Sequence, residues 1–538
     1  RDPQLMRWKR VAVFTATVVG VLAPAQQVLA HAGLESSVPA ANAVLETGPP
    51  NIVLDFNEAI DTGLTDIELY DQAATLVATG LPTAGSDNTI VQASVPTIGD
   101  GVYVVVWRVP SEDGHVVNGV YSFQVGTQSG VDMGALIAKV SGNVTATSTV
   151  GRLDTASRLL ALIGLIVLVG GGLLAIQAAD AAANRMLLWM AWAFLLLGSL
   201  GAFGLYGATV VAGSPSDALK PSVWGKIVGS HTATVLIVRM FVIVALGLLL
   251  MDFGRRARAV WRAAAVVTAL ALVLTFSTIG HANTQHPAAL WIGVDALHVT
   301  ALSLWIGGLL MFAFGTTAWL TDPESDRIVR RFSATAMVAV PVIIGTGVAQ
   351  TLKLAGSLTD LTATSWGRTL LVKVSVVTAL VAIGGVSQWL LRHDGPASLK
   401  RNVMVEALIG IAVIGLAAAL VALPPQAVAA SKVYTATLTN QGVVADVTVT
   451  PGRVGQNEVH LVITPPGGSI DPVVSASVEA APLSDATNVV PATLQSSGPN
   501  HYTGTISLSE SGNWSLKITV EPSAGQSVVL TSAVPIPG

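Results

Sequence analysis

The sequence predicts a multi-domain protein in which two β-sandwich domains flank a bundle of eight membrane-spanning helices. Length is the first indication, because 538 residues are too many for a single hydrophobic core. Composition is the second: the mean hydropathy is +0.64 and 11% of the residues are charged, which is typical of a chain with a large membrane-buried part. The third is the order of the segments, since alternating runs typical of strands lie on both sides of long apolar runs.

Charge and cysteine content exclude several classes of protein. The net charge of -4 comes without a basic patch, so no nucleic-acid partner is expected. The chain has no cysteine, which excludes disulfides, thiolate zinc sites and cysteine nucleophiles. Any metal must therefore be held by histidine, methionine, carboxylate or backbone groups.

Residues 1–30 have the pattern of a secretory signal peptide. A positively charged segment, Arg7–Arg10, precedes the apolar segment Val11–Leu22, and Val28-Leu29-Ala30 forms a small-residue cleavage signal. A cut after Ala30 would make His31 the first residue, and its free α-amine and imidazole can close a chelate ring around a metal. The alternatives are an uncleaved anchor helix and a cut one or two residues away.

Residues 31–126 are expected to form a small antiparallel β-sandwich of the Ig-like type. Turn residues such as Gly99-Asp100-Gly101 separate its alternating runs. The predicted strands are Ile52–Phe56, Thr65–Tyr70, Val102–Val109 and Val116–Val125.

The segment Ser111–His115 of this domain carries a candidate metal site. Asp113 and His115 are two residues apart, so on an extended segment their side chains leave the same face. With His31 they offer an amine nitrogen, two imidazoles and one carboxylate, a set that suits the tetragonal N/O geometry of Cu(II). Asp-Gly-His is also common in ordinary turns, so this interpretation depends on its pairing with a histidine at the predicted cleavage point.

The whole of this segment resembles the copper-resistance protein C (CopC) family. The matching residues are His31-Ala32, Ser37-x-Pro39-Ala40, Phe56-Asn57-Glu58, Trp107, Ser111-x-Asp113-Gly114-His115, Gly119 and Phe123-x-Val125. In that family the N-terminal histidine and the Asp and His of Asp-Gly-His bind Cu(II). The resemblance therefore implies His31, Asp113 and His115 as ligands.

Further expectations concern the surroundings of this site and the core of the domain. It implies that Glu58 lies beside the copper, with a solvated carboxylate at a strand end as the alternative. The Met-rich Cu(I) site of some members has no counterpart, since Met133 is the only methionine between His31 and the membrane. Trp107 is expected to be a core aromatic.

Residues 127–152 are interpreted as a linker and residues 153–424 as a membrane domain of eight helices. Each apolar run is near or above the ~20 residues needed to cross a bilayer. The runs lie near 156–177, 186–211, 231–251, 262–280, 289–317, 333–353, 367–390 and 403–423. Arginine and lysine are concentrated in the loops predicted to be cytoplasmic, which favours an orientation with both β-domains outside the cytoplasm.

Three polar residues of the membrane domain are candidate transport groups: His281, Asp295 and His298. Asp295 and His298 are three apart and share one helix face, and polar groups inside membrane spans tend to mark function. For His281 and His286 the alternative is a solvated loop histidine.

Other polar and sulfur-containing side chains are interpreted as structural. Arg239 and Lys373 are expected to be ion-pair partners or to reach the lipid head groups. Met240, Met311 and Met337 are expected to contribute ordinary packing.

This segment resembles the copper-resistance protein D (CopD) membrane family over nearly its full length. The matching residues are Gly280-His281-Ala282, Asp295-x-x-His298, Trp305-x-Gly307-Gly308, Arg331-Phe332-Ser333, Trp366-Gly367-Arg368-x-x-Leu371-x-Lys373, Asn402 and Glu406. That family is associated with moving copper across the inner membrane, usually inward. The resemblance implies a single-chain fusion of two proteins that are often separate.

Residues 431–538 are expected to form a second β-sandwich, also outside the cytoplasm. A Gly-x-Trp pattern, Gly512 and Trp514, resembles small YtkA-like domains. His460 and His501 are interpreted as surface residues. The domain is expected to contact a partner, such as an extracytoplasmic copper chaperone, or to give support near the membrane.

The sequence as a whole predicts a non-enzymatic copper transport protein of the cell membrane, with copper and the lipid bilayer as its partners. The absence of a Gly-x4-Gly-Lys-Ser/Thr loop argues against direct use of ATP. Three alternatives stay open. They are copper tolerance by sequestration or on the efflux side, a copper oxygenase built on the N-terminal histidine, and a membrane haem protein.

Overall fold

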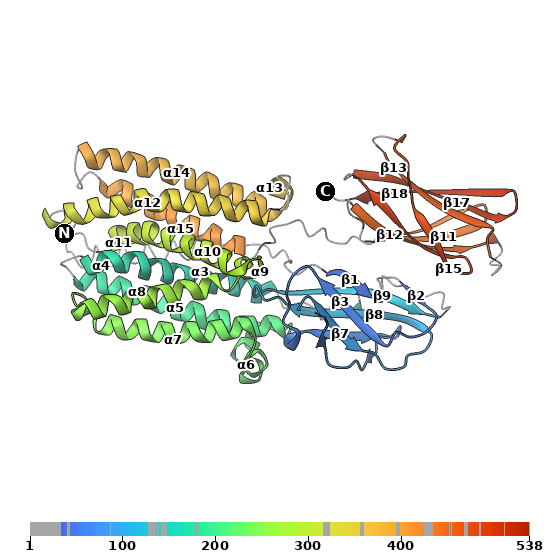
Figure 1. Cartoon of the computed structure of the whole chain (residues 1–538), viewed down its shortest axis with the longest axis horizontal. Coiled ribbons are helices and arrows are strands. Elements are labelled where there is room, and N and C mark those ends of the chain that lie inside the picture. The colour runs from blue at the N-terminus through green and yellow to red at the C-terminus, as the bar shows by residue number, and fades with distance from the viewer. Residues whose placement is uncertain are drawn as a thin grey trace.

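The computed structural model contains a helical bundle and two β-domains, both of which lie at the same end of the bundle (Figure 1). It describes residues 34–39, 43–86, 88–126, 136, 139–140, 148–177, 181–315, 323–355, 360–393, 399–421, 423, 434–450, 452, 455–466, 472–483, 486–509 and 512–536. The predicted signal peptide and His31 lie outside these residues.

The first β-domain consists of two antiparallel-rich sheets packed face to face. One sheet has the order β1-β3-β7-β6 and the other β2-β9-β8-β4-β5. The strands are β1 (Leu34–Val38), β2 (Val44–Leu45), β3 (Asn51–Phe56), β4 (Asp66–Tyr70), β5 (Leu76–Val77), β6 (Thr83–Ala84), β7 (Ile90–Ser94), β8 (Gly101–Pro110) and β9 (Val116–Val125). Trp107 is a core aromatic as expected, 7% exposed and edge-on to Phe56 at 5.2 Å between ring centroids.

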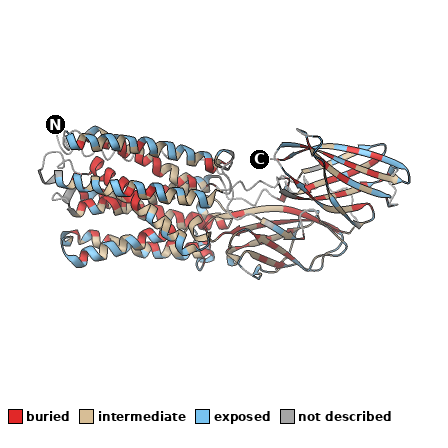
Figure 2. Ribbon diagram, turned by 45° about the horizontal axis from the view of Figure 1, so that its top comes forward, coloured by how far each residue is buried: buried red, intermediate tan, exposed pale blue. Residues whose placement is uncertain are grey.

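Eight helices of the described residues are long and apolar enough to cross a bilayer. The elements of the bundle are α3 (Ser148–Ile166), α4 (Gly172–Gln177), α5 (Ala181–Val210), α6 (Pro221–Ile227), α7 (His231–Met251), α8 (Ala259–Ser277), α9 (His281–Thr284), α10 (Ala288–Leu302), α11 (Gly308–Phe314), α12 (Pro323–Leu354), α13 (Asp360–Ala363), α14 (Ser365–His393) and α15 (Lys400–Val421). Exposed positions follow the outward faces of these helices (Figure 2). Many are large and apolar, such as Phe241 and Val338 at 71% and 67% exposed, as expected of a lipid-facing surface.

The first membrane helix begins earlier than hydropathy predicts. α3 starts at Ser148, inside the segment expected to be a linker. Its first turns are polar, and Arg158 donates to Asp154 one turn away at 2.7 Å. Such an i,i+4 pair supports a helical turn that an apolar run cannot reveal.

Two membrane helices cross at glycines of their π-helical turns. The turn Val167–Gly171 joins α3 to α4, and the turn Ser303–Gly307 joins α10 to α11. A Cβ added to Gly170 would lie 1.8 Å from the backbone oxygen of Ser303, and one added to Gly307 would lie 2.1 Å from that of Ile166. Glycine therefore permits a backbone-to-backbone approach that any larger residue would prevent.

Replacing Gly170 with alanine should lower the thermal unfolding midpoint of the detergent-solubilised chain. The added methyl has to push a backbone carbonyl away, and overpacking of this kind costs about 1–3 kcal/mol. Gly172→Ala is the matched control, because nothing lies within 4 Å of the position of its Cβ. Equal midpoints for the two variants would show that the crossing does not depend on close approach.

The C-terminal β-domain also consists of two sheets. Their orders are β10-β11-β12-β16-β15 and β14-β13-β17-β18. The strands are β10 (Tyr434–Asn440), β11 (Val443–Thr450), β12 (Gly455–Thr464), β13 (Ser475–Pro482), β14 (Val490–Pro491), β15 (Thr493–Gly498), β16 (His501–Leu508), β17 (Gly512–Ser523) and β18 (Gln526–Ile536). Trp514 is 1% exposed in the core between the sheets. His501 of β16 contacts His460 of β12 and is only 9% exposed, so the interpretation of His501 as a surface residue was wrong.

Candidate metal centre

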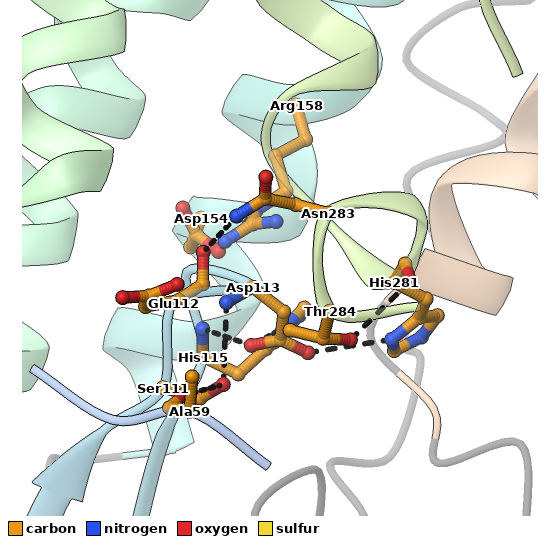
Figure 3. A network of polar contacts seen from close by, with 10 residues as sticks. All are labelled: Ala59, Ser111, Glu112, Asp113, His115, Asp154, Arg158, His281, Asn283 and Thr284. Carbon is orange, nitrogen blue, oxygen red and sulfur yellow. Dashed lines mark hydrogen bonds and ion pairs between the residues drawn. The ribbon is translucent and has the colours of Figure 1, made fainter. Parts of the chain in front are cut away.

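The turn between β8 and β9 positions Asp113 and His115. Ser111 closes the turn, because its N–H donates to the carbonyl of His115 at 2.7 Å and its Oγ accepts from the N–H of Asp113 at 3.2 Å. The N–H of His115 in turn donates to Oδ1 of Asp113 at 2.9 Å. The Asp113 carboxylate is therefore held by a backbone N–H of the turn itself (Figure 3).

Gly114 lies at the point where this turn meets the bundle. Its φ is +89°, a conformation that favours glycine. A Cβ at this position would lie 3.0 Å from Ile279 and 3.2 Å from Thr232, which belong to the helical part of the chain. The turn is thus pressed against the end of the bundle that faces the CopC-like β-domain.

Apolar and polar contacts join the first β-domain to the bundle. Leu64 and Val116 of the β-domain pack against a buried cluster that contains Tyr206 and Ile227. The side chain of Asn283 in α9 reaches the carbonyl oxygen of Glu112 at 3.5 Å. The candidate site therefore lies at the junction of the two domains.

Asp113 is shared between the β-domain and the helical bundle. Its carboxylate is fully buried, with Oδ1 3.1 Å from Nδ1 of His115 and Oδ2 3.3 Å from Nδ1 of His281, the first residue of α9. The two imidazole rings are nearly parallel, with an interplanar angle of 18° and centroids 5.9 Å apart. One carboxylate thus has a histidine from each domain beside it (Figure 3).

Glu58 is buried and lies close enough to Asp113 for the two charges to interact. Burial raises the pKa of Glu58 to about 8, and the negative charge of Asp113 acts in the same direction. Hydrogen bonds from Ser111 and Thr284 act in the opposite direction. Glu58 is therefore mainly protonated at neutral pH.

The structure describes two of the three expected ligands. Asp113 and His115 are adjacent, whereas His31 lies outside the described residues. Within the described residues, no three His, Asp or Glu side chains converge closely enough to hold a metal ion by themselves. His286 is exposed, whereas His281 is directly at the site.

Comparison with protein families assigns the parts of the chain. The CopC domain model matches residues 34–126. The model for the N-terminal domain of copper resistance protein D-like proteins matches residues 151–289, and the copper resistance protein D (CopD) model matches residues 326–420. The chain is a CopC–CopD fusion. Both families are those of copper resistance proteins, and neither is a family of enzymes.

Individual relatives are similar to the whole chain or to its CopC domain. The chain is 25% identical over 518 residues to the copper transport protein CutJ of Bacillus subtilis (strain 168), covering 91% of this chain and 93% of CutJ. It is 33% identical over 118 residues to protein YobA of Escherichia coli (strain K12), covering 21% of this chain and 90% of YobA.

Two solved structures are similar to the CopC domain. CopC from Methylosinus trichosporium OB3b is 29% identical with a TM-score of 0.18, covering 19% of this chain and 98% of that chain. PcoC, a methionine-rich copper resistance protein from Escherichia coli, is 29% identical with a TM-score of 0.17, covering 18% of this chain and 100% of that chain.

A polar cluster lies inside the CopD domain, between α10 and α12. Gln350 donates to Oδ1 of Asp295 at 3.1 Å, and Nδ1 of His298 lies 2.9 Å from Oγ1 of Thr346. The charge of Lys373 on α14 acts on both Asp295 and His298, and that of His281 acts on Asp295. Asp295 and His298 therefore do share a face, which is turned toward α12.

A cavity of about 370 Å³ lies at the other end of this domain, away from the β-domains. It is mainly apolar but includes Glu406, Gln388 and Met337 in its wall. Glu406 accepts from the hydroxyl of Ser387, and Nε2 of Gln388 lies 3.5 Å from Sδ of Met337. Met311, in contrast, is buried in the apolar core, as expected of ordinary packing.

The interpretation of Arg239 was wrong. Its guanidinium is buried and donates to Oγ1 and to the carbonyl oxygen of Thr275, at 3.1 and 2.6 Å. It also lies 3.7 Å from the centroid of the Phe276 ring. The sequence suggested an ion pair or a head-group contact, but hydroxyl, carbonyl and π contacts within α8 satisfy this cation instead.

Proposed function

We propose that this CopC–CopD fusion captures Cu(II) outside the cytoplasm and passes copper inward through its membrane domain. The observation that carries the proposal is the position of Asp113, which lies between His115 of the CopC domain and His281 of the CopD domain. A carboxylate in this position can hold a cation on one side and release it to the other.

Capture is assigned to His31, Asp113 and His115. Removal of residues 1–30 would give His31 a free α-amine, and the amine, two imidazoles and one carboxylate match the tetragonal preference of Cu(II). Glu58, mainly protonated at neutral pH, adds little negative charge beside Asp113. The domain boundaries that go with this assignment are 31–126, 127–152, 153–424 and 431–538.

Transfer to the CopD domain is assigned to ligand exchange at His281. Its Nδ1 lies 3.3 Å from Oδ2 of Asp113, within reach of a cation that Asp113 holds. An imidazole that enters before the carboxylate leaves keeps copper coordinated throughout. This avoids the large desolvation cost of a bare cation at the entrance to the membrane.

Inward passage is assigned to the polar groups deeper in the bundle. Asp295 and His298 offer a carboxylate and an imidazole to copper that leaves His281. The cavity with Glu406, Gln388 and Met337 follows at the inner end, where carboxylate, amide and thioether groups are again present. In this orientation both β-domains lie outside the cytoplasm, in agreement with the arginine-rich loops at the opposite end.

The test compares His281→Gln with His286→Gln in cells that lack the native gene and grow at low copper. We expect copper accumulation, measured by mass spectrometry, to fall about 10-fold or more for H281Q, a loss typical of residues that orient or relay a bound metal. H286Q is the matched control, since His286 is an exposed histidine five residues along the chain. The electron paramagnetic resonance spectrum of bound Cu(II) should show the same number of nitrogens in both, because His281 is not a capture ligand.

Two outcomes would contradict the proposal. Normal accumulation by H281Q would exclude transfer through His281. Higher cellular copper in cells without the protein than in cells with it would indicate efflux or sequestration rather than uptake.

A further inference from the structure

A strongly basic turn joins α7 to α8 at the end of the bundle that lies away from the β-domains (Figure 1). This turn, residues 252–262, is called the α7–α8 turn below. Its four arginines are Arg255, Arg256, Arg258 and Arg262. Asp252 is the single acidic residue of the stretch, so the turn has a clear excess of positive charge and attracts anions.

Contacts within the turn hold several of these arginines in place without using all of their donors. Nη1 of Arg255 lies 3.2 Å from Oδ2 of Asp252, and both side chains are about half exposed. Nε of Arg262 donates to the carbonyl oxygen of Arg256 at 3.0 Å, and the Arg256 guanidinium lies 5.1 Å from the centroid of the Phe253 ring. Each guanidinium has five N–H donors, so Arg255 and Arg262 keep donors for a ligand.

An apolar cavity of about 110 Å³ adjoins the turn. Its wall includes Phe253 and Trp261 from the turn, together with apolar side chains from α4, α5, α7 and α8. The indole N–H of Trp261 donates to the carbonyl oxygen of Leu249 at 3.2 Å, which fixes the ring in this wall. Leu173 and Val266, also in the wall, are 42% and 59% exposed, so the cavity opens onto the lipid-facing surface of the bundle.

We infer that the α7–α8 turn binds an anionic phospholipid of the adjoining membrane leaflet, with the phosphate on the arginines and part of one acyl chain in the cavity. The planar fork of arginine matches phosphate oxygens, and basic clusters next to a membrane helix attract anionic head groups. The cavity takes a short stretch of the chain, while the rest of the lipid stays in the bilayer.

Charge and cavity together select this ligand over simpler ones. Inorganic phosphate would contact the arginines and leave the cavity empty, whereas an uncharged lipid would fill the cavity and leave the arginines without an anion. A bound phospholipid would also join the inner ends of α7 and α8 to α4 and α5, because all four helices line the cavity. The inference depends on the bundle spanning a membrane but not on the route that copper takes.

The test is native mass spectrometry of the full-length chain in a neutral detergent with equal amounts of phosphatidylglycerol and phosphatidylcholine. We expect the native chain to retain one phosphatidylglycerol about 10-fold more often than phosphatidylcholine, since only the first lipid is anionic. Arg258→Gln with Arg262→Gln should remove this preference. Arg327→Gln with Arg401→Gln is the matched control, because it removes two exposed arginines from the first turns of α12 and α15.

A second pair of variants tests the cavity with every arginine intact. Gly172 lies in the cavity wall, and nothing lies within 4 Å of the position of its Cβ, so Gly172→Leu fills the cavity without a clash. It should lower the retention of phosphatidylglycerol, whereas Gly345→Leu, at an equally open glycine of α12, should not.

Three results would overturn the inference. They are equal retention of the two lipids by the native chain, equal retention of phosphatidylglycerol by the Arg258/Arg262 variant and its control, and displacement of phosphatidylglycerol by excess inorganic phosphate. The comparison of the two lipids on the native chain needs no substitution, so it decides the matter even where a variant fails to fold.

Discussion

Replacing Asp113 with asparagine should weaken Cu(II) binding by the mature full-length chain by about 100-fold or more. Loss of groups that merely orient a ligand typically costs 10–100-fold in metal affinity, and Asp113 is itself a proposed ligand. Asparagine preserves the shape of this fully buried side chain, so the change removes charge rather than packing. Competition titration with a Cu(II) chelator measures the loss.

The matched control is Asp66→Asn in the same CopC domain. Asp66 also pairs with a basic residue, Arg108 at 2.8 Å, but on the solvent-facing side of the β4–β8 pair. Its loss should leave Cu(II) affinity unchanged. An affinity of D113N within a factor of two of the native chain would remove Asp113 from the site.

Glu58 provides an internal check on this experiment. Removing the negative charge of Asp113 lowers the pKa of Glu58 from about 8, because that charge contributes to the rise. More of Glu58 is then ionised at neutral pH and is available to bind copper. The double variant D113N with Glu58→Gln should therefore bind Cu(II) more weakly than D113N alone.

Replacing Asp295 with asparagine should abolish copper movement and also destabilise the CopD domain. Asparagine can still accept from Gln350, but Lys373 loses the attraction of a carboxylate in its surroundings. Removing a negative charge from the surroundings of a buried cation is destabilising. Cellular copper accumulation and thermal unfolding in detergent measure the two effects.

A second substitution separates transport from stability. Lys373→Met in the D295N background removes the uncompensated cation, so the double variant should recover most of the lost thermal stability. Copper accumulation should stay at the level of cells without the protein, because the carboxylate is still absent. Recovery of both properties would show that Asp295 is a structural partner of Lys373 and does not bind copper.

Much of the architecture could be predicted from periodicity. Long apolar runs predicted the eight spans, and short runs between turn residues predicted strands such as Val102–Val109, which is close to the observed β8 (Gly101–Pro110). The proximity of Asp113 to His115 was predicted for an extended segment, but the structure brings the two residues together in a turn with φ +89° at Gly114.

Contacts between distant segments could not be predicted from the sequence. The meeting of Asp113 with His281 depends on how the CopC domain docks on the bundle, and no local pattern encodes that orientation. The pairing of His460 with His501 depends on the register of β12 against β16, which alternation within each strand leaves open. Arg239 illustrates a third limit, because its partners are a hydroxyl, a carbonyl and a ring rather than the complementary charge that sequence reasoning looks for.

Gly170 and Gly307 allow two of the long membrane helices to touch through their backbones at one point, which makes that point a pivot. Sliding of one helix along the other would make backbone atoms collide at this point. The parts of the two helices on either side of the crossing can therefore tilt but cannot slide. His298 lies five residues before the π-helical turn at Ser303, about 8 Å along the helix axis, and Asp295 lies farther out. A tilt of α10 about this point would therefore displace Asp295 more than His298. The displacement would be largest at the end of α10 that lies toward the CopC domain.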